Sequence, residues 1–234
     1  MTELRETRHQ FREDLAELER QVLGGLDLVV SQLDRAQESI AYQDVELASM
    51  VVADDDRIDG RYLEVHQGIL SMLARQAPVA SDLRILAALL HVIRCIERMG
   101  DQCVNIAKLV PLSGYESPKD KDILDAIEKM ELQARSQVLQ AKDALSDRNV
   151  ALARALVRQD ADINRLNREI FKRAVEIGDD VDMREWGMFM ILVARCLERI
   201  GDNTVDIAEQ VVFIVTGLFR EMDGSTPSVD PGSP

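Results

Sequence analysis

Two stretches of the chain carry matched carboxylates spaced four residues apart. Residues 94–107 read RCIERMGDQCVNIA, residues 195–208 read RCLERIGDNTVDIA, and nine of the fourteen positions are identical. On a helix, residues i and i+4 lie one above the other, so the two acids of each stretch share a face. The pairs are Glu97 with Asp101 and Glu198 with Asp202, and Asp206 extends the second row by one turn.

The acidic rows coincide with apolar positions of the same helices. Ile93 and Val104 fall within about 40° of Glu97 on a helical wheel, and the second stretch repeats this arrangement. We therefore expect the carboxylates to lie on the face that contacts the core. Like charges at i and i+4 are unfavourable even in water, and an unpaired carboxylate on a buried face is far more so. Something must compensate these charges.

Two kinds of partner would satisfy the rows. Clustered carboxylates bind hard or borderline metal ions, and a cation site is the interpretation we favour. A glycine in the middle of each helix fits it, because glycine costs about 1 kcal/mol relative to alanine and leaves room for a ligand or a close helix. The alternative is an ion-pair network with nearby arginines. The glycines are Gly100 and Gly201, and the arginines are Arg94, Arg98, Arg195 and Arg199.

A second acidic row precedes each of these stretches. Asp55 and Asp59 are again four residues apart and share a helical face with apolar residues. Asp160 follows Asp55 at an offset of 105 residues, and Asn164 replaces Asp59 at the same offset. Asp55, Asp59 and Asp160 therefore join the candidate ligands. His66 shares this face and is either a further ligand or a core histidine.

Apolar residues recur every three or four positions through most of the chain, which predicts helices. We expect helices over about 8–40, 44–75 with Asp44 as its cap, 119–145 and 182–220. A further helix begins near 81 or 82 and runs into the first acidic stretch, and another follows the turn at 147–149 and includes Ala174. No alternating pattern predicts a strand. The predicted fold is all-α, with two tandem three-helix bundle repeats related by pseudo-twofold symmetry, or alternatively one six-helix array. The repeats would span 1–112 and 119–222, with a linker at 113–118 and a disordered tail at 223–234.

The composition narrows the classes of partner. The chain has 28 Lys and Arg against 42 Asp and Glu, a net charge of −14, which argues against nucleic-acid binding and adsorption to anionic lipid. The three cysteines, Cys95, Cys103 and Cys196, form no disulfide framework. The N-terminus is charged and no apolar run has membrane-spanning length, so we expect a cytoplasmic protein without membrane insertion.

These motifs resemble those of the PhoU family of phosphate-transport regulators. The resemblance covers about residues 11–220 and rests on ERMGD followed by NIA, ERIGD followed by DIA, QAPVASDLR, DDDRID and DADIN. It implies two tandem three-helix repeats. In some members the E(D)xxxD motifs bind multinuclear iron or other divalent ions. Carried over, this implies Glu97, Asp101, Glu198 and Asp202 as the principal ligands, helped by Asp55, Asp59 and Asp160.

The resemblance also implies a regulator and not an enzyme. Such proteins contact the ATPase subunit of the phosphate ABC transporter and a phosphate-sensing histidine kinase, and we expect a homodimer. The sequence shows no P-loop and no nucleophile–base pair. Three alternatives stay open: an accessory of a low-affinity phosphate transporter, a structural scaffold whose acids pair with arginines, and a di-metal carboxylate enzyme. The enzyme would need two Glu-x-x-His pairs, and the chain has one, Glu6 with His9.

Overall fold

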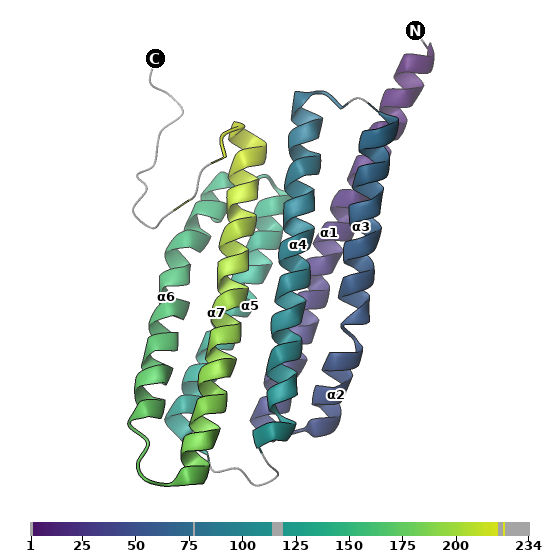
Figure 1. Ribbon diagram of the computed structural model, residues 1–234. Helices are drawn as coiled ribbons and strands as arrows, with labels where there is room; N and C mark the ends of the chain where they lie inside the picture. Colours follow the sequence, from purple (N-terminus) through teal and green to yellow (C-terminus); the bar gives the residue numbers. More distant parts are fainter. Residues whose placement is uncertain (1, 77, 114–118, 220–221, 223–234) are drawn as a thin grey trace, which may run out of the picture.

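Long helices running side by side make up the protein. The computed structural model describes residues 2–76, 78–113, 119–219 and 222, and these residues form helices and no strand (Figure 1). The all-α fold with two three-helix repeats is therefore confirmed. The helices are α1 (Thr2–Tyr42), α2 (Val45–Ala53), α3 (Asp56–Arg75), α4 (Ala80–Leu109), α5 (Lys121–Ser146), α6 (Val150–Val175) and α7 (Val181–Thr216), with a short 3₁₀ helix at Pro111–Ser113.

The two repeats meet along four of these helices. Helices α1 to α4 form the first repeat and α5 to α7 the second, so that α2 and α3 together correspond to α6. Helix α4 packs against α7, and α1 packs against α5, while α3 and α6 lie on the outer sides (Figure 1). Apolar side chains of all these helices form one continuous core. The acidic stretches of α4 and α7 therefore lie next to the contact between the repeats.

Capping residues set several helix ends. Asp44 accepts a hydrogen bond from the backbone N–H of Leu47 at 2.9 Å, so the predicted cap is confirmed. Asp120, Asn149 and Asp180 cap α5, α6 and α7 in the same way. Helix α7 ends earlier than predicted, because Gly217 adopts a left-handed conformation with φ of 74°. Residues 114–118 of the predicted linker and the tail at 223–234 lie outside the described residues.

The single helix predicted over 44–75 is wrong, because the chain breaks between α2 and α3. The backbone N–H of Arg57 bonds to the carbonyl of Asp54 at 3.1 Å, a tighter turn than α-helix. Three consecutive aspartates occupy the break, and adjacent carboxylates that are poor helix formers destabilise a continuous helix there. Arg35 of α1 holds the broken end by an ion pair with Asp54 at 2.5 Å. Around Asp160, where the flanking residues are not acidic, α6 is unbroken.

Within the described residues, no helix combines the length and apolar character needed to cross a membrane.

The contact between α1 and α5 includes exposed ion pairs that connect one repeat to the other. Arg135 pairs with Asp34 at 2.8 Å and Lys142 with Asp27 at 2.6 Å. Each such pair contributes about 1 kcal/mol or less, so these contacts fix the register of α1 on α5 more than they stabilise the fold.

One buried acid of α5 predicts a pH-dependent stability. Glu131 is 5% exposed and stands 105 residues after the buried Leu26. Burial, with Asp34 nearby, raises the pKa of Glu131 from 4.5 to about 7. When an acid has a higher pKa in the folded state than in the unfolded state, the free energy of unfolding falls as the pH rises from the unfolded-state pKa to the folded-state pKa.

The variant Glu131→Gln removes this ionisation. We expect it to raise the free energy of unfolding by about 1–3 kcal/mol at pH 8 and to leave it nearly unchanged at pH 4, where both states of the wild type are protonated. Urea unfolding at the two pH values measures the effect. An equal change at both would show that the charge of Glu131 is not responsible.

Candidate functional site

A glycine in each acidic motif lets the preceding helix come close. A Cβ atom at Gly100 would lie 3.2 Å from Oδ1 of Asp55 and 3.0 Å from Cδ1 of Ile58. At Gly201 it would lie 2.9 Å from Oδ1 of Asp160 and 3.0 Å from Cδ1 of Ile163. In both repeats, therefore, the missing side chain makes the space that a carboxylate of the neighbouring helix occupies.

In the first repeat, carboxylates of α3 and α4 lie close enough to repel one another. Burial raises the pKa of Asp55, and the charges of Asp59 and Asp101 raise it further. Burial and Asp101 also raise the pKa of Glu97, against the opposing effect of Arg94. Oε2 of Glu97 is buried without a hydrogen-bond partner among the described residues, and the nearest nitrogen of Arg94 is 3.7 Å away. Among the described residues, the contact of this oxygen with a positive group within 4.0 Å is therefore a long ion pair without a hydrogen bond.

The second repeat has the same arrangement on α6 and α7. Burial and the charge of Asp202 raise the pKa of Asp160 to about 6. Oδ2 of Asp160 accepts a hydrogen bond from Asn164 at 2.6 Å, whereas its buried Oδ1 has no partner in the described part of the chain. Glu198 forms an ion pair with Arg195. Here the amide of Asn164 lowers the pKa of Asp160, whereas Asp59, at the equivalent position of the first repeat, raises the pKa of Asp55.

Two buried glutamines complete these clusters, and the sequence analysis missed both. Gln32 of α1 is 1% exposed and donates to the carbonyl of Val51 at 3.2 Å and to Oδ1 of Asp55 at 3.4 Å. Gln137 of α5 is fully buried, and its Oε1 accepts from Thr204 at 3.4 Å. The two glutamines are 105 residues apart, which is the offset that relates Asp55 to Asp160. Extending the repeat into the first helix of each unit would have found them.

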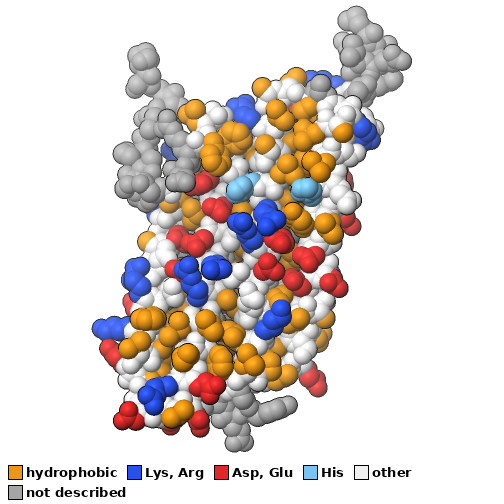
Figure 2. Space-filling model, in the orientation of Figure 1, with side chains coloured by type: hydrophobic (Ala, Val, Ile, Leu, Met, Phe, Trp, Pro, Cys, Tyr) orange, Lys and Arg blue, Asp and Glu red, His pale blue; other side chains and the backbone are white. Residues whose placement is uncertain are grey.

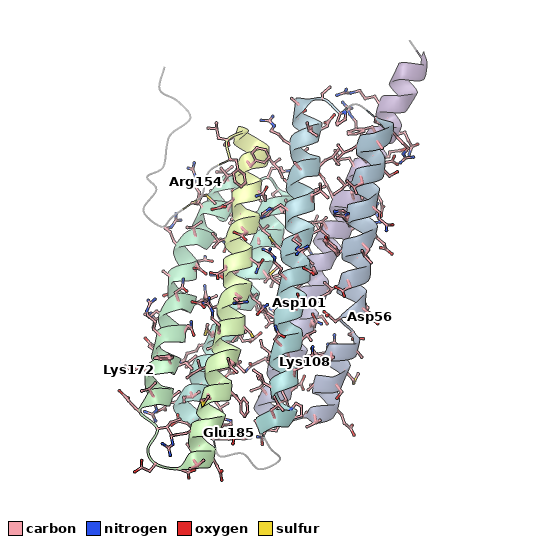
Figure 3. All side chains as sticks on the ribbon, in the orientation of Figure 1. Asp56, Asp101, Lys108, Arg154, Lys172 and Glu185 are labelled. Atoms are coloured by element: carbon pink, nitrogen blue, oxygen red, sulfur yellow. The ribbon has the colours of Figure 1, made fainter. Side chains whose placement is uncertain are left out.

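The expectation that the carboxylates face the core is wrong for three of them. Asp59, Asp101 and Asp202 are exposed, whereas Glu97 and Glu198 are half-buried. Helix α4 packs against α1, α3 and α7, so apolar residues cover most of its circumference. Apolar neighbours on a helical wheel therefore do not show that the face of Glu97 is the buried one. Figure 3 labels Asp101 on α4 beside the break between α2 and α3. The rows therefore run along the rim of the helix contacts.

The alternative of an arginine network is realised in part. Arg94 and Arg195 lie beside the glutamates of their own helices. Arg98 and Arg199 form no ion pair within 4.0 Å of a described acid. Within the described part of the chain, no arginine forms an ion pair with an aspartate of either row. At the same time, neither row brings three ligand atoms within 4.8 Å of one another in the described part of the chain, so a shared ion requires side-chain rotation.

Asp206 does not extend its row as predicted. It is half-buried at the contact between α7 and α4, where burial raises its pKa and the charges of His91 and Arg98 lower it. Because the side chain turns to a helix of the other repeat, Asp206 does not belong to the cluster around Asp160.

The glycines give a direct test of the close helix contacts. We expect Gly201→Ala to destabilise the fold by about 1–3 kcal/mol, because its Cβ would displace Asp160 or Ile163. The matched control is Gly60→Ala in α3, where an added Cβ atom would have no atom within 4 Å apart from its chain neighbours and the nearby backbone of its own helix. This variant should stabilise the fold by up to about 1 kcal/mol through helix propensity. Urea unfolding of both variants measures this, and equal stabilisation by the two would contradict the proposed packing.

Comparisons with known proteins agree with this architecture. The family model described as the PhoU domain matches residues 25–110 and 127–211. A phosphate-specific transport system accessory protein PhoU homolog of Clostridium acetobutylicum is 30% identical over 214 residues, covering 90% of this chain and 96% of the relative. The crystal structure of PhoU from Pseudomonas aeruginosa has a TM-score of 0.79 at 27% identity, covering 89% of this chain and 100% of that one. The phosphate transport system regulatory protein PhoU from Streptococcus pneumoniae has a TM-score of 0.84 at 24% identity, covering 91% and 100%, and this likeness concerns the fold.

Proposed function

The chain belongs to the PhoU family, and on this premise we propose that it is a metal-binding helical adaptor that restrains phosphate uptake and the phosphate-starvation response. The names of its relatives support a regulatory role connected with phosphate transport. Its proposed partners are the ATPase subunit of the phosphate ABC transporter and a phosphate-sensing histidine kinase. We propose that it works in the cytoplasm as a homodimer.

The observation that carries the metal proposal is a buried carboxylate oxygen in each repeat that accepts no hydrogen bond from the described residues. Oε2 of Glu97 and Oδ1 of Asp160 are both buried and lack a hydrogen bond within the described residues. A buried carboxylate oxygen in this state is unfavourable unless a cation binds it. Oxygen donors suit hard divalent ions and iron, so the donor set of the two rows fits the proposed ions.

Each row would hold its ions with residues of one repeat. The first site uses Asp55, Asp59, Glu97 and Asp101, and the second uses Asp160, Glu198 and Asp202. A bound cation supplies positive charge where several carboxylates repel one another. Because the second site has one carboxylate fewer, we expect it to bind more weakly than the first.

Bound ions would also change the surface that a partner meets. Acidic and basic side chains form a band across the middle of the face shown in Figure 2, with apolar side chains above and below it. Three of the carboxylates, Asp59, Asp101 and Asp202, are exposed. Metal binding would lower the negative charge of the band and fix α3 against α4 and α6 against α7. A partner that recognises this face would then distinguish the metal-bound protein.

The scaffold alternative has one specific observation in its favour. Arg94 and Arg195 supply a positive charge beside Glu97 and Glu198 without any metal. The same fold could then serve a low-affinity phosphate transporter or act as a structural scaffold. The di-metal enzyme has the least support. His9 of its one Glu-x-x-His pair is exposed, and its Nδ1 lies 3.5 Å from Oε1 of Glu13 on the surface of α1, away from a bundle core.

The metal proposal is tested by elemental analysis of protein purified without chelator or metal-affinity resin. The comparison is between the wild type and the variant with Glu97, Asp101, Glu198 and Asp202 all changed to alanine. We expect at least one oxygen-bound cation per wild-type chain and its loss in the variant, with the helical circular dichroism signal preserved. Equal metal content in the two proteins would contradict the assignment.

The same two preparations test the adaptor role separately. Immobilised transporter ATPase subunit and kinase should each retain the wild type, and we expect the quadruple variant to bind at least tenfold more weakly. Equal binding of both proteins would support the adaptor role and contradict a role of the metal in partner binding. No binding of either protein to either partner would contradict the adaptor itself.

A further inference from the structure

A second group of metal-binding side chains lies between the two repeats. His91 and Cys95 are one turn apart on α4, and Asp206 reaches them from α7. One ligand atom from each side chain lies within 4.8 Å of the other two, and no other such group of three occurs among the described residues. The acidic rows connect helices within a repeat, whereas this group connects one repeat to the other.

The three donors match the chemistry of zinc. Zinc binds imidazole nitrogen, thiolate sulfur and carboxylate oxygen at about 2.0–2.3 Å, and three protein ligands leave a fourth position for water. We propose that His91, Cys95 and Asp206 form a Zn²⁺ site that bridges α4 and α7. Tetrahedral ligands at those bond lengths lie about 3.5 Å apart, so side-chain rotations of about 1 Å would close the group around the ion.

The burial of the three ligands fits an open zinc site. Cys95 is 1% exposed and Asp206 is half-buried, while His91 is exposed. The sulfur and the carboxylate therefore lie on the core side and the imidazole closes the group from the solvent side. The fourth position would face outward, where water or an exogenous ligand can reach it.

Without an ion, the surroundings disfavour the charged forms of two of these groups. Burial, and to a smaller extent the nearby Asp206, raise the pKa of the Cys95 thiol to about 12. Burial also raises the pKa of Asp206, while His91 and Arg98, which lie near its carboxylate, lower it. A zinc ion would deprotonate the thiol outright and neutralise the carboxylate. A bound ion would therefore explain why Cys95 and Asp206, two groups that are both negative when ionised, lie side by side.

The pseudo-twofold axis provides an internal control. At the offset of 101 residues, Cys95 corresponds to Cys196, but His91 corresponds to Leu192, and Asp206 corresponds to Asn105. The opposite side of the interface thus has a half-buried cysteine without the other two ligands. Only one of the two equivalent positions has the donors for zinc, so the two cysteines should respond differently to the metal.

Cobalt(II) is the probe for this site, because it replaces zinc and gives a thiolate-to-metal charge-transfer band when a cysteine binds it. The full-length chain would be titrated with cobalt in a non-thiol reductant. We expect a band whose amplitude at saturation corresponds to one cobalt–thiolate bond per chain in the wild type and in Cys196→Ser, that is absent in Cys95→Ser, and that zinc abolishes by displacement. Circular dichroism checks that each variant is folded.

Two further variants test the remaining ligands. His91→Ala and Asp206→Asn should each lower zinc affinity by more than about tenfold, measured by competition with a chromophoric chelator, since even outer-shell changes cost that much. The variant lacking Glu97, Asp101, Glu198 and Asp202 should keep the cobalt band, which separates this site from the proposed acidic sites. No band in the wild type, a band that persists in folded Cys95→Ser, or a band lost in Cys196→Ser would overturn the proposal.

Discussion

Carboxylates held between packed helices are the constraint on which the rest of this structure depends. Asp55 and Asp160 each lie against a glycine of the neighbouring helix, where an added Cβ atom would lie 3.2 Å from Oδ1 of Asp55 and 2.9 Å from Oδ1 of Asp160. Burial and neighbouring carboxylates raise the pKa of both. The apolar core must therefore stabilise the fold against these charges. Gln32, which donates to Asp55, relieves part of this penalty, and the proposed cations would relieve the remainder.

Helical periodicity and the internal repeat predicted the all-α fold and the pairing of the two acidic motifs. The break at Asp54 and Asp55 was missed because the apolar periodicity continues through it, although three adjacent aspartates mark the place. Gln32 and Gln137 were missed because the repeat was not followed into the first helix of each unit. The partner of Asp206 could not be predicted, since the rotation of α7 against α4 depends on packing between distant segments.

The two classes of proposed site differ in what they connect. The acidic rows lie within a repeat, use oxygen donors and occur twice. The group of His91, Cys95 and Asp206 lies between the repeats, mixes nitrogen, sulfur and oxygen, and occurs once in the described residues. Oxygen sites suit hard ions and the mixed site suits zinc. Metal supply could therefore act separately on the stiffness of each repeat and on the contact between them.

The most direct test of the central claim compares the wild type with Asp160→Asn by urea unfolding at about pH 7.5. The pKa of Asp160 is about 6 when folded and 3.8 ordinarily, so its charge destabilises the metal-free fold above both values. We predict that the variant is more stable than the wild type by about 1–3 kcal/mol in chelator, and less stable than it in saturating divalent metal. A wild type that is the more stable protein in chelator would contradict the account, because the existing side chains would then already compensate the charge.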